Sequence, residues 1–425
     1  MIKILNCEEV EKSEIFSRIS PTANVSETVS EIIAKVRKNK DKALIYYAEK
    51  FDGAKLSSLL VSEEEINEAF SEVDNEFIEI LNKAKENIVK FHSEQKREGF
   101  QITEGDVTVG QKVIPIEKVG LYVPGGTAAY PSTVLMDSVP AKIAGCKEIV
   151  MVTPSNKEGK INPVILVAAK IAGVDKIFKT GGAQAIAALA YGTETSPAVY
   201  KIVGPGNAFV AEAKKQVFGV VSIDMIAGPS EILIVADKTS NPKFIAADLL
   251  SQAEHDKMAS AVLITDSKEL AKSVSEELEK QIPELERSEI ARASIDNNGK
   301  IIVCKNLEEG IEIANEIAPE HLELCVDNPF ECLDLIKNAG SVFLGKFCPE
   351  ALGDYFAGPN HTLPTSGTAK FSSPLSVDDF VKKTQYIYYT EDALKKVGND
   401  VAYFAKKEGL TAHAKSAVIR LEEKK

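Results

Sequence analysis

The chain has 425 residues, of which 44% are hydrophobic and 27% are charged, and its formal net charge is −13 at pH 7. This composition is typical of a globular protein that buries a large core. The acidic balance, with a pI near 5.2, argues against a nucleic-acid partner, because binding phosphates requires an excess of Lys and Arg on some face.

The cysteines and the first residues of the chain indicate a cytoplasmic protein. The six cysteines contain no CxxC pair and no regular spacing, so neither a disulfide framework nor a thiolate zinc site is expected. The start, MIKILNCEEVEK, has no basic region leading into a long apolar core. No stretch approaches the roughly 18 apolar residues of a membrane span, so we expect no membrane partner.

The predicted elements change in character along the chain. The first hundred or so residues are charged and helix-periodic, with few Gly or Pro. From about Val119, apolar strands followed by Gly or Pro turns and helices recur in VGLYVPGG, EIVMVTPS, KIFKTGGAQAIAALA and KIVGPGNAFVAEAKKQ. The pattern resumes with SEILIVAD, SAVLITDS, KIIVCKN and AGSVFLG, and after about Ser373 the chain becomes helical again. These units predict an α/β fold with parallel, doubly wound sheets and helical ends.

The segment IAADLLSQAEHD predicts an amphipathic helix that presents polar groups together. Its buried stripe is expected to consist of Ala246, Leu249, Leu250 and Ala253. Asp248, Gln252 and His255 then share the opposite face, and residues three apart on a helix lie one above the other. Gln252 and His255 can therefore reach one ion, although an isolated QxxH is more often part of a solvated helix face.

Other histidine-bearing segments strengthen the prediction of a metal. His321, His361 and His413 each lie in a short polar segment of the second half, and Asp354 lies in LGDYFAG. A set of Gln, Asp and two His offers oxygen and nitrogen ligands suited to Zn²⁺, Mn²⁺ or Co²⁺, with positions left open for a substrate. This pattern favours a catalytic metal over a structural one.

The segment APEHLEL places Glu320 and His321 next to each other, just after a proline that should end a helix. A histidine suits proton transfer and a nearby carboxylate can activate water, so the pair can divide two proton-transfer tasks. Such a dipeptide alone is usually a surface feature. His361 lies in a loop rich in Gly and Pro that is typical of a binding loop, or it is a loop histidine bonded to nearby backbone.

Two glycine-rich segments resemble nucleotide-binding motifs only in part. GPGNAF begins like a dinucleotide fingerprint but has Phe209 where the third glycine belongs. It still follows a strand and opens a helix, as TGGAQAIAALA does, so backbone N–H groups there can hold a pyrophosphate. GSVFLGKF has P-loop spacing, but Phe347 replaces the Ser or Thr that binds Mg²⁺, which argues against nucleoside triphosphate chemistry.

A resemblance to a known family rests on motifs that occur in one fixed order. They are VGLYVPGGTA, GGAQAIAALA, GPGNAFV, DMIAGPSEILIVAD, DLLSQAEHD, PEHLE, AGSVFLG, GDYFAGPNHTLPT and EGLTAH. Together they resemble the histidinol dehydrogenase family over nearly the full length. The resemblance implies NAD-dependent oxidation of L-histidinol to L-histidine in two hydride transfers through bound L-histidinaldehyde, the last steps of histidine biosynthesis.

The resemblance also implies a role for each matching residue. One Zn²⁺ per subunit would be bound by Gln252, His255, Asp354 and His413. His321 would take the alcohol proton, and Glu320 would help water attack the aldehyde. Substrate contacts would come from the metal ligands and His321 together with Ser230, His361 and Glu408, and NAD contacts from Tyr122, Gln184 and Asn207.

The family architecture implies two incomplete Rossmann-like domains, similar to those of aldehyde dehydrogenases, in a homodimer with shared active sites. The expected parts are an N-terminal extension at 1–22, a discontinuous α/β domain at 23–118 plus 231–373, an inserted α/β domain with NAD-binding glycine loops at 119–230, and a C-terminal helical extension at 374–425 exchanged in the dimer. Glu408 and His413 would then complete the partner subunit's site.

Three other functions stay open from the residues alone. Glu320 and a metal can together activate water in a hydrolase whose glycine loops are only structural. A related dehydrogenase can act on another alcohol, although His361 and Glu408 favour a substrate that bears an imidazole. The third is a binding or assembly protein without activity, which the set of acid, base and metal-ligating residues disfavours.

Overall fold

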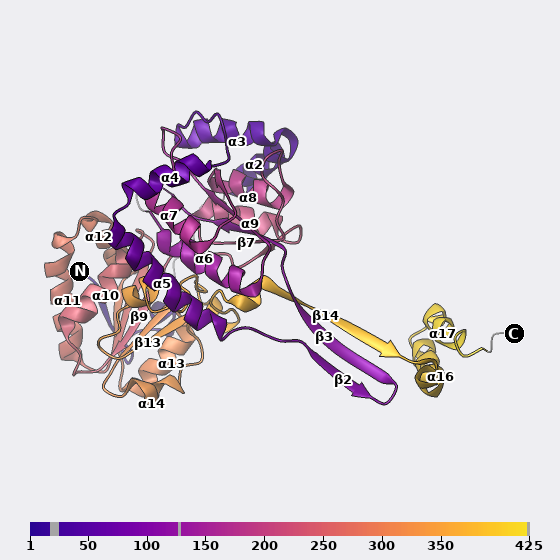
Figure 1. Ribbon diagram of the computed structural model, residues 1–425. Coiled ribbons are helices and arrows are strands. Elements are labelled where there is room, and N and C mark those ends of the chain that lie inside the picture. The colour runs from indigo at the N-terminus through magenta and orange to yellow at the C-terminus, as the bar shows by residue number, and fades with distance from the viewer. Residues whose placement is uncertain (18–24, 126–128, 423–425) are drawn as a thin grey trace. The chain divides into compact units, whose positions relative to one another are not determined.

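The computed structural model describes residues 1–17, 25–125 and 129–422, and these form two compact units. Unit 1 comprises Met1–Gln95 and Ile116–Phe380, and unit 2 comprises Lys96–Pro115 and Val381–Lys425. Figure 1 traces the chain through both. No helix in the described part of the chain is long and apolar enough to cross a membrane.

Unit 1 contains a six-stranded parallel sheet. In spatial order its strands are β1 (Lys3–Asn6), β11 (Lys300–Val303), β10 (Ser260–Thr265), β9 (Glu231–Ala236), β12 (His321–Cys325) and β13 (Ser341–Leu344). After β9 the chain adds β10 and β11 on one side, and later β12 and β13 on the other. The strand order therefore reverses between β9 and β12.

Helices cover both faces of this sheet because its strands are apolar on both sides. One face packs on α10 (Pro242–Ala253), α11 (Lys268–Gln281) and α12 (Ser288–Asn298), through alternate β9 residues such as Ile232 and Ile234. The other face, through Leu233 and Val235, packs on α1 (Lys12–Ile15), α13 (Leu307–Ile317) and α14 (Pro329–Leu333). The short helix α15 (Glu350–Tyr355) contacts α10.

A second parallel sheet of unit 1 has five strands. Its order is β6 (Lys176–Lys179), β5 (Glu148–Thr153), β4 (Lys118–Tyr122), β7 (Lys201–Val203) and β8 (Ser222–Ile223). One face packs on α6 (Pro131–Ala144) and α7 (Pro163–Ala172), and the other on α8 (Gly182–Tyr191) and α9 (Ala208–Val217). The switch point here lies between β4 and β7.

The N-terminal helices form an outer layer over the helices of the five-stranded sheet. Helices α2 (Ser26–Asn39), α3 (Asp41–Tyr47) and η1 (Ala48–Asp52) precede α4 (Glu63–Glu72) and α5 (Asn75–Ser93). Helix α2 packs on α8 and α9, α4 on α7, and α5 on α6. The domain limits expected from the sequence stay a prediction, and the observed packing associates these helices with the five-stranded sheet.

Local sequence sets where the site-bearing helices begin. The Asn241 side chain accepts a hydrogen bond from Lys243 N at the start of α10, and Pro242 occupies the first helical turn. Asn207 caps α9 in the same way, because its Oδ1 accepts from the backbone N–H groups of Phe209 and Val210. Short 3₁₀ turns η2 (Ile282–Glu284), η3 (Thr368–Lys370) and η4 (Val377–Phe380) complete unit 1.

Unit 2 is a three-stranded antiparallel sheet followed by two helices. The strand order is β14 (Val381–Tyr389), β3 (Val107–Pro115) and β2 (Phe100–Glu104), and the helices are α16 (Glu391–Lys407) and α17 (Thr411–Val418). The sequence predicted helix after about Ser373 and missed β14. The β-favouring TQYIYY run is stabilised there by nine paired positions with β3.

The predicted fold class is confirmed: this is an α/β protein with parallel, doubly wound sheets. The stripe expected on α10 is confirmed too, because Ala246, Leu249, Leu250 and Ala253 are all buried.

Candidate active site

His321 stands at the amino end of β12, beside the start of β9, and its imidazole is buried. Its Nδ1 lies 3.1 Å from the backbone oxygen of Glu231. A carbonyl oxygen only accepts hydrogen bonds, so Nδ1 carries the proton and Nε2 is left with a lone pair. Among the described residues Nε2 has no hydrogen-bond partner. The ring is therefore oriented with an unprotonated nitrogen facing the site.

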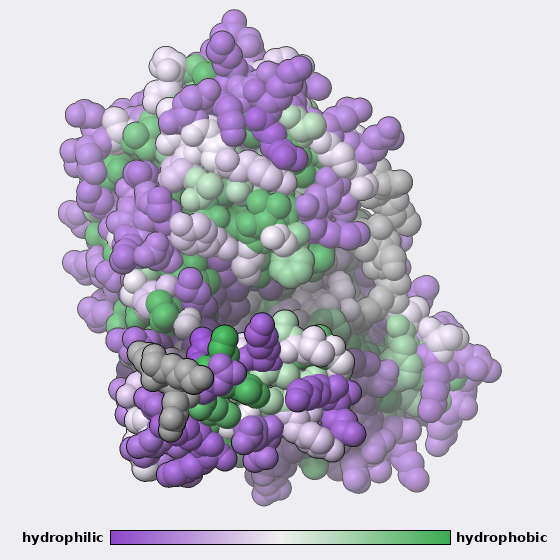
Figure 2. Space-filling view, turned by 90° about the vertical axis from the view of Figure 1, so that its right-hand side faces the viewer, coloured by the Kyte–Doolittle hydropathy of each residue, from purple (hydrophilic) through white to green (hydrophobic). Residues whose placement is uncertain are grey.

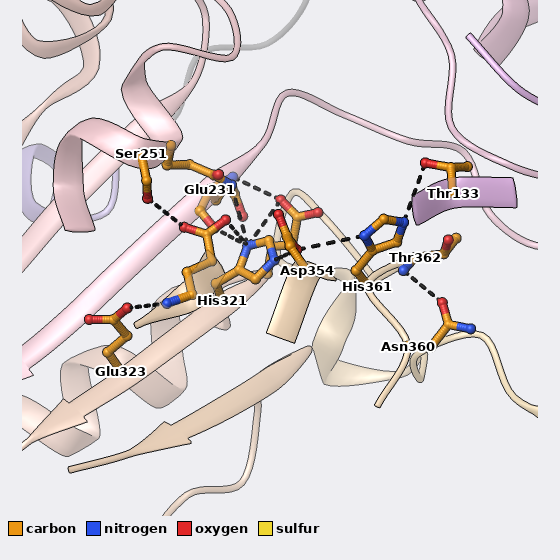
Figure 3. A network of polar contacts seen from close by, with 12 residues as sticks. Thr133, Glu231, Ser251, His321, Glu323, Asp354, Asn360, His361 and Thr362 are labelled. Carbon is orange, nitrogen blue, oxygen red and sulfur yellow. Dashed lines mark hydrogen bonds and ion pairs between the residues drawn. The ribbon is translucent and has the colours of Figure 1, made fainter. Parts of the chain in front are cut away.

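Burial keeps this imidazole neutral. It lowers the pKa of His321 to about 4, although the nearby Asp354 carboxylate acts in the opposite direction. His321 is thus the free base at neutral pH and can accept a proton. Figure 3 shows the ring among Glu231 and Asp354, with His361 on the far side of Asp354.

Gln252, in the last turn of α10, is buried against the same ring. With its amide nitrogen turned toward Glu350, Nε2 donates to Oε1 at 2.7 Å. The amide oxygen then accepts from His321 Nδ1 at 3.3 Å and from Glu231 N at 3.2 Å. Gln252 therefore lies beside His321, held between the Glu350 carboxyl group and two N–H groups.

Carboxyl groups surround His321. Glu320 is buried and its Oε2 accepts from Glu231 N at 2.9 Å. Glu350 Oε1 lies 3.7 Å from His321 Nδ1, and Asp354 Oδ1 lies 3.9 Å from Nε2. Burial raises the pKa of Glu320 and Glu350 well above the usual range, since it disfavours the charged form. No Lys or Arg in the described part of the chain forms an ion pair with these carboxyl groups.

Three residues here could hold a metal ion, and among them only Asp354 belongs to the ligand set expected from the sequence. One ligand atom each from His321, Glu350 and Asp354 lies within 4.8 Å of the others. Sequence reasoning missed Glu350, although it lies four residues before Asp354 and so on the same face of α15. The spacing of four residues between Glu350 and Asp354 is the feature of the sequence that indicates this pairing.

His255 does not lie on the helix that the sequence predicted for it. Helix α10 ends at Ala253, and His255 follows in an exposed turn with its N–H bonded to Gln252 O at 3.2 Å. His255 nevertheless contributes to lowering the pKa of both His321 and His361, after burial as the main cause. His255 is therefore near the site, brought there by the turn.

His361 completes the described cluster. Its Nδ1 lies 3.7 Å from Asp354 Oδ1 and its Nε2 lies 3.3 Å from Thr133 Oγ1 of α6. Burial lowers the pKa of His361. Ser230, half-buried, directly precedes Glu231 at the start of β9.

Glu408 and His413 belong to unit 2. Glu408 follows α16, His413 lies in α17, and both are exposed. Unit 1 by itself thus brings together Gln252, Glu320, His321, Asp354 and His361, and neither of these two residues.

The three residues expected to bind NAD follow strands of the five-stranded sheet. Tyr122 ends β4, and its hydroxyl accepts from Gly182 N at 3.1 Å at the start of α8. Gln184 is buried in α8, and its Oε1 has no partner in the described structure. Asn207 follows β7 as the cap of α9. They therefore surround the carboxyl ends of β4, β6 and β7, where dinucleotides bind in such sheets.

A cavity of about 490 Å³ opens at the same edge. Its lining includes Asp52, Pro124, Thr153, Pro154 and Ser155. The hydroxyls of Ser155 and of Thr180, which follows β6, are buried without hydrogen-bond partners among the described residues. Unpaired polar groups at a strand edge are typical of a site that a polar ligand completes.

Known proteins resemble the chain over nearly its whole length. The family model of histidinol dehydrogenase matches residues 17–421. The histidinol dehydrogenase of Clostridium acetobutylicum is 59% identical over 401 residues, 94% of this chain and 93% of its own, and that of Bacillus cereus is 58% identical over 402 residues, 94% of each. A crystal structure of histidinol dehydrogenase from Elizabethkingia anophelis superposes with a TM-score of 0.94 at 40% identity, over 99% of this chain and 98% of that one. The chain therefore belongs to the histidinol dehydrogenase family, a family of oxidoreductases.

Proposed function

We propose that the protein oxidises L-histidinol to L-histidine with NAD and one zinc ion per subunit, through L-histidinaldehyde that stays bound. The observation that carries the proposal is the pairing of His321 and Glu320 at the amino end of β12, each buried and each held by the backbone of Glu231. Two buried proton-transfer groups side by side match a reaction with two different proton transfers.

His321 would act as base on the alcohol. Its Nδ1–H is engaged by the Glu231 carbonyl, so the proton from the substrate hydroxyl would go to Nε2. A neutral imidazole suits this role because the group is already deprotonated at neutral pH.

Glu320 would assist water in the second oxidation. Its Oε2 is fixed by Glu231 N, and burial raises the pKa of its carboxyl. A carboxylate with a raised pKa binds a proton more readily, so it is a stronger base toward the water that attacks the aldehyde.

The residues fit a zinc ion. Nitrogen and oxygen donors are present, and a group of carboxyls without a Lys or Arg counter-ion in the described structure favours a bound cation. Gln252, His255 and Asp354 would hold it together with His413. Bound there, zinc would supply a positive charge that fixes and polarises the substrate. Ser230, His361 and Glu408 would contact the substrate.

The residues also fit a dinucleotide. The switch point between β4 and β7, the starts of α8 and α9, and the unpaired oxygens of Ser155, Thr180 and Gln184 offer hydrogen bonds to sugar and phosphate groups. Tyr122, Gln184 and Asn207 would contact NAD, which when bound accepts the hydride in each oxidation.

A homodimer with shared sites would account for Glu408 and His413. Unit 2 exposes large apolar side chains that a lone subunit leaves in water: Phe100, Ile102, Ile387, Tyr388, Tyr403 and Phe404. Figure 2 shows hydrophobic side chains among hydrophilic ones on the face that it views. Exposed apolar surface of this kind is typical of a protein interface, so it supports a subunit contact through unit 2, which exchange of 374–425 would require.

The test is the stoichiometry of NADH formation by the zinc-loaded protein with limiting L-histidinol. We expect two NADH per histidinol, loss of activity on chelation and recovery with zinc. One NADH per substrate would contradict the second oxidation. No NADH with bound metal would assign the protein to another alcohol or to hydrolysis.

A further inference from the structure

Helix α6 holds the loop that carries His361. Thr133 Oγ1 is 3.3 Å from His361 Nε2, on the side of the ring opposite Asp354 (Figure 3). Thr133 is itself buried, with 3% of its surface exposed. One nitrogen of the imidazole is thus hydrogen-bonded to α6, and the other faces Asp354 at 3.7 Å.

The two neighbours of His361 are bound to the same helix. Asn360 Nδ2 donates to the Met136 carbonyl at 2.6 Å, and Asn360 Oδ1 accepts from Thr362 N at 2.8 Å. Thr362 Oγ1 donates to Asp137 Oδ1 at 2.9 Å. Three consecutive loop residues are therefore each bound to α6.

These contacts come from one face of α6. Residues 133, 136 and 137 are three and four apart, so they lie in one row along the helix. Helix α6 belongs to the five-stranded sheet, whereas Asp354 and His321 belong to the elements of the six-stranded sheet. These three α6 residues therefore set where His361 lies relative to Asp354 and His321.

The second contact depends on the buried carboxyl group of Asp137. It is completely buried, and the other groups that face it are the Asp224 carboxylate and the Lys214 ammonium, which are paired with each other. Its Oδ2 has no partner among the described residues. Burying a carboxyl costs free energy that an apolar side chain at the same place would not, and the hydrogen bond from Thr362 offsets part of this cost.

The start of α6 adjoins the proposed cofactor site. Ala129, two residues before the helix, lines the cavity of about 490 Å³, and Thr133 lies one turn later. The helix thus runs from the cofactor side to the histidine of the substrate side.

We propose that Thr133 and Asp137 are positioning residues for the substrate, which fix the His361 imidazole through one direct hydrogen bond and one through Thr362. This rests on the proposed function, in which His361 contacts L-histidinol. Loss of either hydrogen bond releases the imidazole from its place without removing a reacting group. Substrate binding is then weakened more than the chemical step.

The test compares Thr133→Val, which keeps shape and removes the hydroxyl, with Thr133→Ser, which keeps the hydroxyl. For Thr133→Val we expect kcat/KM for L-histidinol to fall roughly three- to tenfold, as for one hydrogen bond, mainly through KM. Thr133→Ser should stay within about twofold of wild type. Asp137→Val removes the acceptor for Thr362 and should lower kcat/KM as Thr133→Val does. Asp137→Asn keeps an amide oxygen that accepts from Thr362, so it should stay near wild type as Thr133→Ser does.

Thermal unfolding of each variant checks that it folds. If Thr133→Val does not fold, Thr133→Ala is used in its place. Equal kinetic constants for Thr133→Val and wild type would overturn the proposal. So would equal losses in the Val and Ser variants, or a loss in kcat alone. A wild-type protein that forms no NADH from L-histidinol would overturn the proposed function, and this inference with it.

Discussion

At the scale of single residues, His321 and Glu320 are adjacent in sequence yet have separable tasks. Replacing His321 with Asn should lower kcat by roughly 10²- to 10⁴-fold, as for loss of a general base, with little change in the KM for L-histidinol. Steady-state NADH formation measures both constants. His92, buried in α5 and bonded to Gln95, provides the control: His92→Gln should change stability and leave kcat near wild type. A similar kcat for His321→Asn and wild type would exclude His321 as the base.

Glu320→Gln should act on the second oxidation alone. The amide keeps the size of the side chain but cannot take a proton from water, so NADH formed per histidinol should fall from two toward one in a single-turnover experiment. Accumulation of the aldehyde, detected with a carbonyl reagent, is the accompanying result. Two NADH per substrate at the wild-type rate would contradict this role.

Asp137 makes stability depend on pH in a definite direction. Burial, aided by Asp224, raises the pKa of Asp137 to about 8, above that in the unfolded chain, so the native state holds the proton more tightly. The stability from this proton is present in full below about pH 4 and is lost as the pH rises from about 4 to about 8. Asp137→Asn lacks this dependence. Urea unfolding at pH 5 and pH 8 measures the free energy of unfolding of both proteins. Relative to wild type, Asp137→Asn should be more stable at pH 8 than at pH 5. The same stability difference at both pH values would contradict the prediction.

At the scale of elements, α10 links the core to the site, because one face is apolar and the other carries Gln252. Leu249 is completely buried on the apolar face, so Leu249→Ala should lower the free energy of unfolding by about 2–5 kcal/mol. Lys243→Ala, on the exposed surface of the same helix, should change it by less than about 0.5 kcal/mol. Denaturant unfolding of both variants measures the difference, and a comparable cost for the two would show that α10 is not held by this packing.

At the scale of the whole molecule, shared sites predict complementation between two inactive variants. In a mixed dimer of His321→Asn and His413→Asn, one site would carry both defects and the other neither. One of its two sites is then intact, so the purified mixed dimer should have about half of the wild-type activity if the tail is exchanged. Co-expression with two different tags and assay of the doubly purified species measures this. A mixed dimer without activity would show that His413 serves its own subunit.

Features that depend on residues near one another in the chain could be predicted from the sequence. The alternation of apolar strands, glycine turns and helices predicted the parallel sheets, and the spacing of Ala246, Leu249 and Leu250 predicted the buried side of α10. Both are confirmed, because hydrophobic periodicity reflects local geometry. The ordered motifs identified the family, and Glu320 next to His321 indicated two proton-transfer tasks.

The groups that act on these residues from distant parts of the chain are known from the folded structure and could not be predicted from the sequence. The Glu231 carbonyl that sets the tautomer of His321, the Glu350 carboxylate beside it and the α6 residues that hold the His361 loop are all far away in the sequence. The lowered pKa of His321 comes from burial, which no local pattern encodes. Strand β14 was missed for the same reason, since its pairing with β3 spans more than 260 residues. Contacts across such separations depend on how the sheets and helices pack. The periodicity of a single segment carries no information about that packing.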